Sequence, residues 1–216
     1  MKPTLVIGNR NYSSWSLRPW LLMRQFGLEF NEIVLPLDTP EFFQRISAYS
    51  PSGRVPALMV GDETIWDSLA ICETVNERWL GGRAWPSSPA ARAIARSAAC
   101  EMHSGFAAMR SQLPMNCRRQ PRTPHWDAAA ARDIERIEQL WQTMLAGQGA
   151  GGDFLCGDFG IVDAMFAPVC IRFRGYGPAL SDSTHAYMAR MFALPAMAEW
   201  IAAAQAEPAR VIADEA

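Results

Sequence analysis

The sequence predicts an α/β N-terminal half followed by an all-helical C-terminal half. In residues 1–80, short β-rich runs alternate with segments of helical periodicity. Residues 81–89 are rich in glycine, proline and serine, which is typical of a linker. After them β-rich runs are scarce and alanine-rich helical patterns dominate. We therefore expect an α/β domain at 1–80, a linker at 81–89 and an all-helical domain at 90–216.

The N-terminal half is predicted to run in the order β-α-β-α-β-β-α. Apolar positions, β-branched residues and turn residues place these elements at 4–7, 17–26, 30–35, 40–48, 57–60, 64–66 and 68–79. Gly61-Asp62 joins the last two strands as a hairpin. A βαβ unit followed by a hairpin and a helix makes a small layered structure.

The C-terminal half is predicted to consist of helices at 90–117, 125–145, 161–174, 184–192 and 195–206. Each segment carries apolar residues three and four positions apart, as one buried helix face requires. The first of them is expected to be a single long helix.

The composition fits an ordinary globular protein: half of the residues are hydrophobic, 19% are charged, and the net charge is −2. Such a charge gives no footprint for nucleic acid or for an anionic membrane as a partner. No signal-peptide pattern and no bilayer-spanning apolar stretch occurs, so we expect a cytoplasmic protein.

The chain has five cysteines, an odd number, and no C-x-x-C pair. This pattern favours neither a disulfide framework nor a zinc site, and no metal is expected. All five are instead expected to be buried as small hydrophobic residues. They are Cys72, Cys100, Cys117, Cys156 and Cys170.

A serine-rich turn, YSSWS at residues 12–16, lies between the first predicted strand and the first predicted helix. A helix N-terminus offers unpaired N–H groups and the positive end of the helix dipole, so it favours an anion. A serine hydroxyl there could also donate to a thiolate, lowering a thiol pKa by about one to three units in all. Simple N-capping by these serines is the alternative. Because Pro19 lacks an N–H and suits a first turn, we expect the helix to begin near Ser16, leaving Ser13 and Ser14 in the loop.

Two further motifs offer main-chain or hydroxyl groups to a ligand. Val55-Pro56 opens a predicted strand; if this bond is cis, the Val55 main chain could pair with an extended peptide, and a trans proline at a strand edge is the alternative. Asp67-Ser68 precedes the last helix of this half. Either residue can cap that helix, and the serine with the free helix N-terminus could hold a ligand carboxylate.

The strand-turn-serine-helix, the later V-P step, the D-S-x-A-I segment at 67–71, the linker and the helical half together resemble the cytosolic glutathione transferases. The resemblance covers nearly the whole chain. It implies a thioredoxin-like N-terminal domain with Pro56 as its cis-proline, a helical C-terminal domain and a homodimer. It also implies reduced glutathione as co-substrate, with a small apolar electrophile or a peroxide as the second partner.

The resemblance also assigns roles to site residues. The first serine of the turn stabilises the thiolate in the family, which selects Ser13, with Ser14 as the second choice. Val55 lends main-chain bonds to the cysteinyl part of glutathione, and Arg54 lies where a contact with the tripeptide is common. In the same way, Asp67 and Ser68 correspond to the pair that holds the γ-glutamyl end.

Within the family, SSWSLR at residues 13–18 is similar to the S-S-C-x-W-R stretch of the zeta class, the maleylacetoacetate isomerases. Trp15 stands at the cysteine position and Leu17 at the tryptophan position. We therefore expect a bacterial, zeta-like, serine-type glutathione transferase. The alternatives are a non-catalytic relative that binds or regulates, and a zeta-like isomerase acting on a maleyl-type diacid.

Three features of the helical half complete the expectations. Residues 159–164 resemble the family's capping-box segment, with Gly160 at the cap and Asp163 reaching back to main-chain N–H groups as a structural residue. Arg118, Arg119 and Arg122 are expected to form a solvated basic loop. One helix face could line the electrophile pocket, or could simply serve core or dimer packing; it comprises His103, Phe106, Met109, Arg110 and Leu113.

Overall fold

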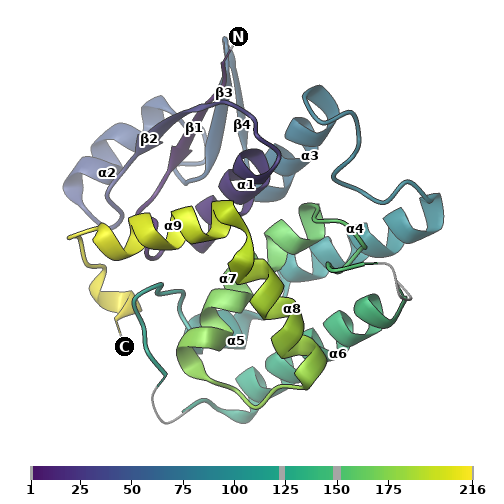
Figure 1. Cartoon of the computed structure of the whole chain (residues 1–216). Helices are drawn as coiled ribbons and strands as arrows, with labels where there is room; N and C mark the ends of the chain where they lie inside the picture. The colour runs from purple at the N-terminus through teal and green to yellow at the C-terminus, as the bar shows by residue number, and fades with distance from the viewer. Residues whose placement is uncertain (1, 122–124, 148–151, 216) are drawn as a thin grey trace.

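The computed structural model describes residues 2–121, 125–147 and 152–215 (Figure 1). Arg122, one member of the expected basic loop, lies outside them. The N-terminal part contains β1 (Thr4–Ile7), α1 (Ser14–Gln25), β2 (Asn31–Val34), α2 (Pro40–Arg45) with a short 3-10 turn (Ile46–Ala48), β3 (Ala57–Val60), β4 (Glu63–Trp66) and α3 (Ser68–Arg78). This confirms the predicted order of elements.

The four strands form one mixed sheet in the order β2-β1-β3-β4. β1 and β2 are parallel, with Val6 opposite Ile33, while β3 runs antiparallel to both β1 and β4. Side chains alternate between the faces of the sheet: Leu5 and Leu58 join the main core, and Val6 packs in a smaller cluster with α2. Burial on both faces explains why the central strands read as continuous apolar runs.

The rest of the described chain is helical. It contains α4 (Pro89–Ser104), α5 (Ala107–Gln112), α6 (Ala128–Gly147), α7 (Ile161–Tyr176), α8 (Asp182–Ala193), α9 (Pro195–Ala206) and a final 3-10 turn (Ile212–Asp214). α1 packs against α7, α3 and α9, so it is the element on which the two halves meet (Figure 1). No helix of the described residues is both long and apolar enough to cross a bilayer.

The single long helix expected at 90–117 is wrong, because the chain breaks at Gly105 and Phe106. Gly105 is extended, and Phe106 takes a left-handed conformation with φ of 60°. A Cβ on Gly105 would lie 2.8 Å from the Glu101 carbonyl oxygen, so only glycine fits there. The break ends α4 at Ser104 and lets α5 start in a new direction.

The predicted start of α1 near Ser16 is also wrong. The Ser13 carbonyl accepts the Leu17 N–H at 3.1 Å, so helical pairing already includes Ser14, and Pro19 lies inside the helix. Pro19 cannot donate to the helix. The helix holds because every residue from 16 to 23 is buried against the sheet and α7. Ser13 is therefore the residue that precedes the helix, and Ser14 is its first residue.

The cysteines differ from expectation at two positions. Cys72, Cys117 and Cys170 are buried, but Cys100 is exposed and Cys156 is only partly covered. Burial raises the pKa of Cys117 and of Cys156 to about 12, so neither is a thiolate near neutral pH. All five are free thiols.

The N-terminus of α7 confirms the structural role predicted for Asp163. Its carboxylate accepts the Gly160 N–H at 2.9 Å, the Leu155 N–H at 3.0 Å and the Tyr187 hydroxyl at 3.1 Å. Gly160 is needed because a Cβ there would lie 2.6 Å from the Ala84 carbonyl oxygen. The linker segment passes too close for a residue with a side chain at this capping position.

Replacing Gly160 by serine should therefore destabilise the protein, although serine is the better capping residue in general. The clash with the Ala84 main chain should lower the free energy of unfolding by about 1–3 kcal/mol. Urea unfolding monitored by tryptophan fluorescence measures the change. An increase in stability in the variant would show that the linker can move aside at no cost.

Candidate active site

The turn that carries Ser13 is formed by its own main chain. The N–H groups of Tyr12 and Ser13 both donate to the Asn9 carbonyl, at 3.2 and 2.8 Å. Ser13 is buried and makes no side-chain capping bond; its hydroxyl instead donates to Ser16 Oγ at 2.7 Å. Ser16 Oγ also accepts the Gly8 N–H at 3.1 Å, which ties the turn to the end of β1.

The first turn of α1 keeps donors free. The hydroxyl of half-buried Ser14 has no partner within the described chain, and the N–H groups of Trp15 and Ser16 have no acceptor there either. Free N–H groups at a helix N-terminus attract an anion. Simple N-capping therefore does not account for either serine, and both remain candidates for a contact with a thiolate.

The Val55–Pro56 peptide bond is cis, as the resemblance implied for Pro56. Val55 is partly exposed, and neither its N–H nor its C=O bonds to another described residue. An extended peptide can pair with such free main-chain groups. Arg54, the residue before it, is exposed and makes no ion pair with the described chain.

Asp67 and Ser68 have different tasks at the start of α3. Asp67 caps the helix, with Oδ1 accepting the N–H groups of Leu69 at 2.9 Å and Ala70 at 3.2 Å. Its φ of 77° is strained for a residue with a side chain, and such strain is often found at functional sites. Ser68 is buried and does not cap; its oxygen accepts a bond from Arg18, so its N–H and its hydroxyl hydrogen are the donors available to a ligand.

Arg18, the last residue of the SSWSLR stretch but not one of the predicted site residues, joins the two halves next to this pair. It is only 2% exposed; Nε donates to the Met165 carbonyl in α7 at 3.2 Å, and Nη1 donates to Ser68 Oγ at 3.4 Å. Burial, followed by the neighbouring charges of Arg110 and Arg172, lowers the pKa of Arg18 to about 9. It therefore stays charged at neutral pH and adds positive potential beside Ser68.

Trp15 stands between two cations. The Arg18 guanidinium lies 4.2 Å from its ring centroid and that of Arg110 lies 4.9 Å away, while the His103 ring meets it edge-on at 5.4 Å. His103 Nε2 is 3.1 Å from Asp67 Oδ2. The predicted face of the second half thus divides: His103 and Arg110 contact the first half.

The remaining residues of that face lie in the core. Phe106, Met109 and Leu113 are buried with the main hydrophobic cluster and carry no polar group toward the turn.

Burial lowers the pKa of His103, and the Asp67 charge opposes that effect. The described residues hold no group of three or more His, Cys, Asp or Glu side chains placed to bind a metal ion.

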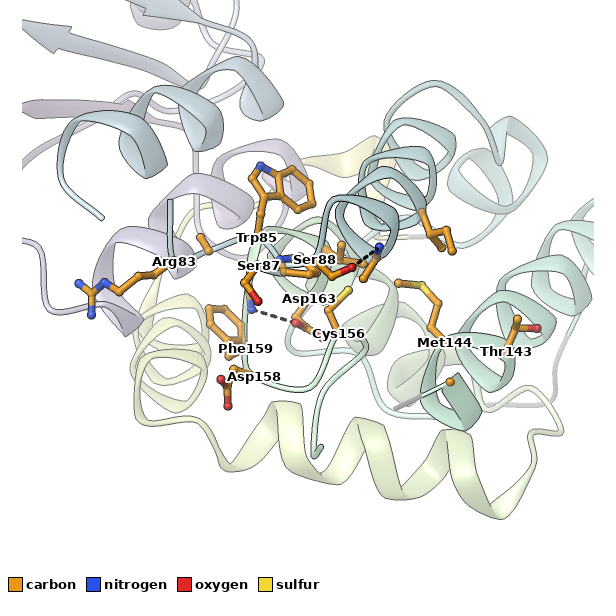
Figure 2. A pocket seen from close by; sticks show the side chains of 17 residues that line it. Arg83, Trp85, Ser87, Ser88, Thr143, Met144, Cys156, Asp158, Phe159 and Asp163 are labelled. Carbon is orange, nitrogen blue, oxygen red and sulfur yellow. Dashed lines mark hydrogen bonds between the residues drawn. The ribbon is translucent and has the colours of Figure 1, made fainter. Parts of the chain in front are cut away.

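A separate cavity of about 720 Å³ lies between the 83–88 segment, α4, α6 and the start of α7 (Figure 2). Trp85, Met144 and Phe159 contribute to its lining. No residue predicted for the glutathione site lines it.

The fold and this arrangement define a two-domain protein with a thioredoxin-like N-terminal domain and a helical C-terminal domain. The family model of the glutathione S-transferase N-terminal domain matches residues 12–78, and that of the C-terminal domain matches residues 124–203. The chain belongs to the glutathione S-transferase family.

Two named proteins have sequences similar to that of this chain. Maleylacetoacetate isomerase from Rattus norvegicus is 28% identical over 169 residues, covering 77% of this chain and 76% of its own. Dichloromethane dehalogenase from Methylophilus leisingeri is 37% identical over 68 residues, which are 29% of this chain. The match spans only 24% of the dehalogenase.

Solved structures share the fold. A glutathione transferase homologue from Burkholderia, crystallised with bound glutathione, aligns with a TM-score of 0.73 at 20% identity, covering 96% of this chain and all of its own. A diazinon-metabolizing glutathione S-transferase from the silkworm, Bombyx mori, gives 0.75 at 15% identity, covering 94% of this chain and 97% of its own.

Proposed function

We propose that this protein is a glutathione transferase that binds reduced glutathione and holds its thiol as a thiolate at the N-terminus of α1. The observation that carries the proposal is the free first turn: the N–H groups of Trp15 and Ser16 and the Ser14 hydroxyl have no partner in the described chain. Family membership and the glutathione bound to the Burkholderia homologue support it.

Ser13 is the proposed thiolate donor, with Ser14 as the second choice. To donate a hydrogen bond to the sulfur, the Ser13 hydroxyl must rotate away from Ser16 Oγ. Ser16 Oγ would still accept the Gly8 N–H. A hydroxyl rotates easily, and a hydrogen bond to a charged acceptor is worth roughly 1.5–3 kcal/mol, more than one to a neutral hydroxyl. Ser14 needs no such exchange, so the two serines have to be tested separately.

The remaining predicted residues surround the tripeptide in this proposal. Val55 pairs with the cysteinyl main chain, and Ser68 offers its N–H and hydroxyl to the γ-glutamyl carboxylate, with Arg18 behind it. Asp67 receives the γ-glutamyl ammonium group. Arg54 is exposed and free to contact the tripeptide.

The reaction then requires ionisation and proximity more than group transfer by the protein. The thiol proton leaves to solvent, the thiolate forms a bond to an electrophilic carbon, and the leaving group departs with its electron pair. With a peroxide, the thiolate attacks one oxygen and the O–O bond breaks. The sulfur is oxidised to a sulfenic acid, and the other oxygen leaves as an alkoxide or hydroxide that takes up a proton from solvent. No metal or redox cofactor takes part in this scheme.

A zeta-like isomerase is the second candidate. The maleylacetoacetate isomerases among the relatives favour it. So does the positive charge of buried Arg18 and Arg172 and of partly buried Arg110, which suits a substrate that carries carboxylates. Trp15 at the cysteine position counts against it. A direct isomerisation assay with a maleyl-type diacid and glutathione decides between the two activities.

Four further expectations from the sequence remain part of the proposal. These are the domain division at residues 80 and 90, a two-fold homodimer, a small electrophile as the second substrate and a cytoplasmic location. A non-catalytic relative with the same fold is the alternative that the following experiment addresses.

Replacing Ser13 by alanine should raise the pKa of the bound glutathione thiol by about one to two units while changing glutathione affinity little. Ultraviolet absorbance of the thiolate against pH gives the pKa, and calorimetry gives the affinity. Ser14→Ala is measured in parallel, and Ser183→Ala, which alters an exposed serine on α8, is the control.

A shifted pKa in Ser14→Ala alone would transfer the role to Ser14. An unshifted pKa in both variants would leave the helix N–H groups as the only source of stabilisation. Wild-type protein that shows no saturable binding of glutathione at millimolar concentration would overturn the enzymatic proposal as a whole.

A further inference from the structure

The N–H groups of Arg10 and Asn11, in the turn that precedes Ser13, are bound by the far end of the chain. Glu207, the first residue after α9, accepts the Arg10 N–H on Oε1 at 2.8 Å and the Asn11 N–H on Oε2 at 3.0 Å. Both oxygens of one carboxylate therefore hold two consecutive main-chain groups. Bonds of this charged kind are stronger than neutral ones.

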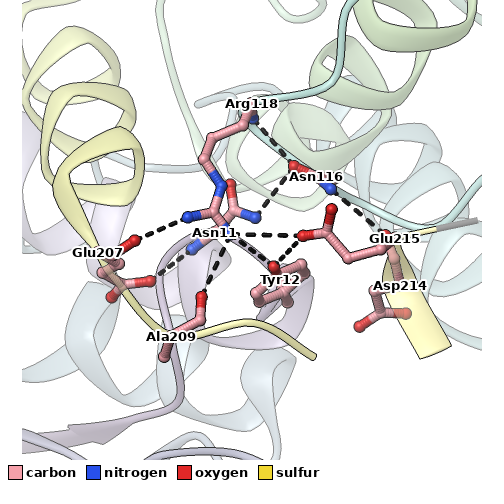
Figure 3. A network of polar contacts seen from close by, with 8 residues as sticks. All are labelled: Asn11, Tyr12, Asn116, Arg118, Glu207, Ala209, Asp214 and Glu215. Atoms are coloured by element: carbon pink, nitrogen blue, oxygen red, sulfur yellow. Dashed lines mark hydrogen bonds and ion pairs between the residues drawn. The ribbon is translucent and has the colours of Figure 1, made fainter. Parts of the chain in front are cut away.

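Arg118, which belongs to neither the turn nor the C-terminal segment, stabilises the same contact. Its Nη1 donates to the Glu207 main-chain oxygen at 2.7 Å, and its Nη2 donates to Tyr12 Oη at 2.5 Å and to the Ala209 carbonyl at 3.2 Å (Figure 3). The expectation of a solvated basic loop is therefore wrong for Arg118. Its side chain lies between the turn and the C-terminal segment.

Two more hydrogen bonds of the turn lie beside those made by Glu207 and Arg118. Asn11 Nδ2 donates to Asn116 Oδ1 at 3.0 Å, and the Tyr12 hydroxyl donates to the Glu215 carboxylate (Figure 3). Residues 10–12 of the turn thus bond to both ends of the C-terminal segment 207–215, at Glu207 and at Glu215, and Ser13 is the next residue.

We propose that Glu207 and Arg118 are positioning residues for the thiol-binding turn, so that segment 207–215 belongs to the thiolate-stabilising machinery. The proposal rests on the proposed function. Ser13 Oγ and the first N–H groups of α1 can stabilise a sulfur anion only if the turn that carries them is held in place. The Asn9 carbonyl bonds shape the turn, and the Glu207 carboxylate anchors its outward N–H groups.

Glu207→Gln tests the proposal because it keeps the side chain's size while turning one acceptor oxygen into a donor. An amide NH₂ group then faces the Arg10 or Asn11 N–H. Loosening the turn should raise the pKa of bound glutathione thiol by about one unit, or about tenfold less thiolate at a given pH below it. If Glu207 acted only through its charge, removing that charge would lower the thiol pKa, so the sign separates the two roles.

Hydrogen exchange in the ligand-free protein provides a readout that does not depend on glutathione. In Glu207→Gln, exchange of the peptide covering residues 9–13 should accelerate about tenfold, with α6 unchanged. Glu199→Gln is the matched control. Glu199 lies on α9, is half-exposed, and forms an ion pair of 2.9 Å with Arg24, which is not part of the turn. Arg118→Met should reproduce both effects, and Glu207→Asp should restore part of them.

A lowered or unchanged thiol pKa in Glu207→Gln would overturn the positioning role. Unchanged exchange at residues 9–13 would overturn the anchoring itself. If wild-type protein fails to bind glutathione, the proposed function fails and takes the catalytic part of this inference with it, whereas accelerated exchange would still establish the anchor.

Discussion

Asp163→Ala is expected to lower the free energy of unfolding by about 3–5 kcal/mol near pH 5, which is at the upper end of the effects that single substitutions have. The substitution leaves three donors inside the protein without an acceptor: the N–H groups of Leu155 and Gly160 and the Tyr187 hydroxyl. Denaturant unfolding measures the loss. Asp158→Ala is the matched control, since Asp158 is exposed and five residues away; a change as small as in this control would contradict the role of Asp163.

The same carboxyl should make stability depend on pH. Burial raises the pKa of Asp163 from 3.8 to about 6, against the lowering effect of its hydrogen bonds. Between these values the folded protein binds more protons than the unfolded chain, so the stability that Asp163 contributes is complete below the lower value and falls as pH rises through the upper one. The difference in unfolding free energy between wild type and Asp163→Asn should shrink from about pH 4 to about pH 7. A difference that grows over this range would contradict the raised pKa.

Local patterns in the sequence were sufficient to predict most elements, and they failed where a distant contact decides the backbone. The β-rich run at 4–7 and the Gly61-Asp62 turn depend only on neighbouring residues, so the strands were predicted correctly. Gly105 looks like a tolerated helix glycine until the Glu101 oxygen is placed 2.8 Å from its missing Cβ. Pro19 suggested a first turn, but the burial of its helix against α7 outweighs the lost hydrogen bond.

The candidate site shows the same division. Asp67 and Ser68 could be chosen because capping residues reveal themselves by position before a helix, and Val55 because proline follows it. Glu207 could not, since its partners Arg10 and Asn11 are 197 and 196 residues away and no local pattern links them. Two signals in the sequence pointed to Arg18: it is a charged residue in the middle of an apolar helix face, and it occupies the arginine position of the SSWSLR stretch.

Arg18→Met should weaken glutathione binding by about ten- to a hundredfold while changing stability by less than about 1 kcal/mol. Methionine has a similar length but neither charge nor donors, so Ser68 loses the cation behind it. Stability should hold because the buried guanidinium carries a large desolvation cost, visible in a pKa lowered to about 9 mainly by burial. Removing it relieves that cost and offsets the lost bond to the Met165 carbonyl.

This variant is informative because affinity is expected to fall while stability is expected to change little. Arg24→Met is the matched control: the same substitution on the same helix, at a half-exposed arginine whose partner is Glu199. Arg18→Lys keeps the charge and should retain more affinity than Arg18→Met. Calorimetry with glutathione and urea unfolding give the two quantities. Equal losses of affinity and stability would mean that Arg18 only joins α1 to α7, whereas loss of affinity alone means that its charge faces the γ-glutamyl carboxylate at Ser68.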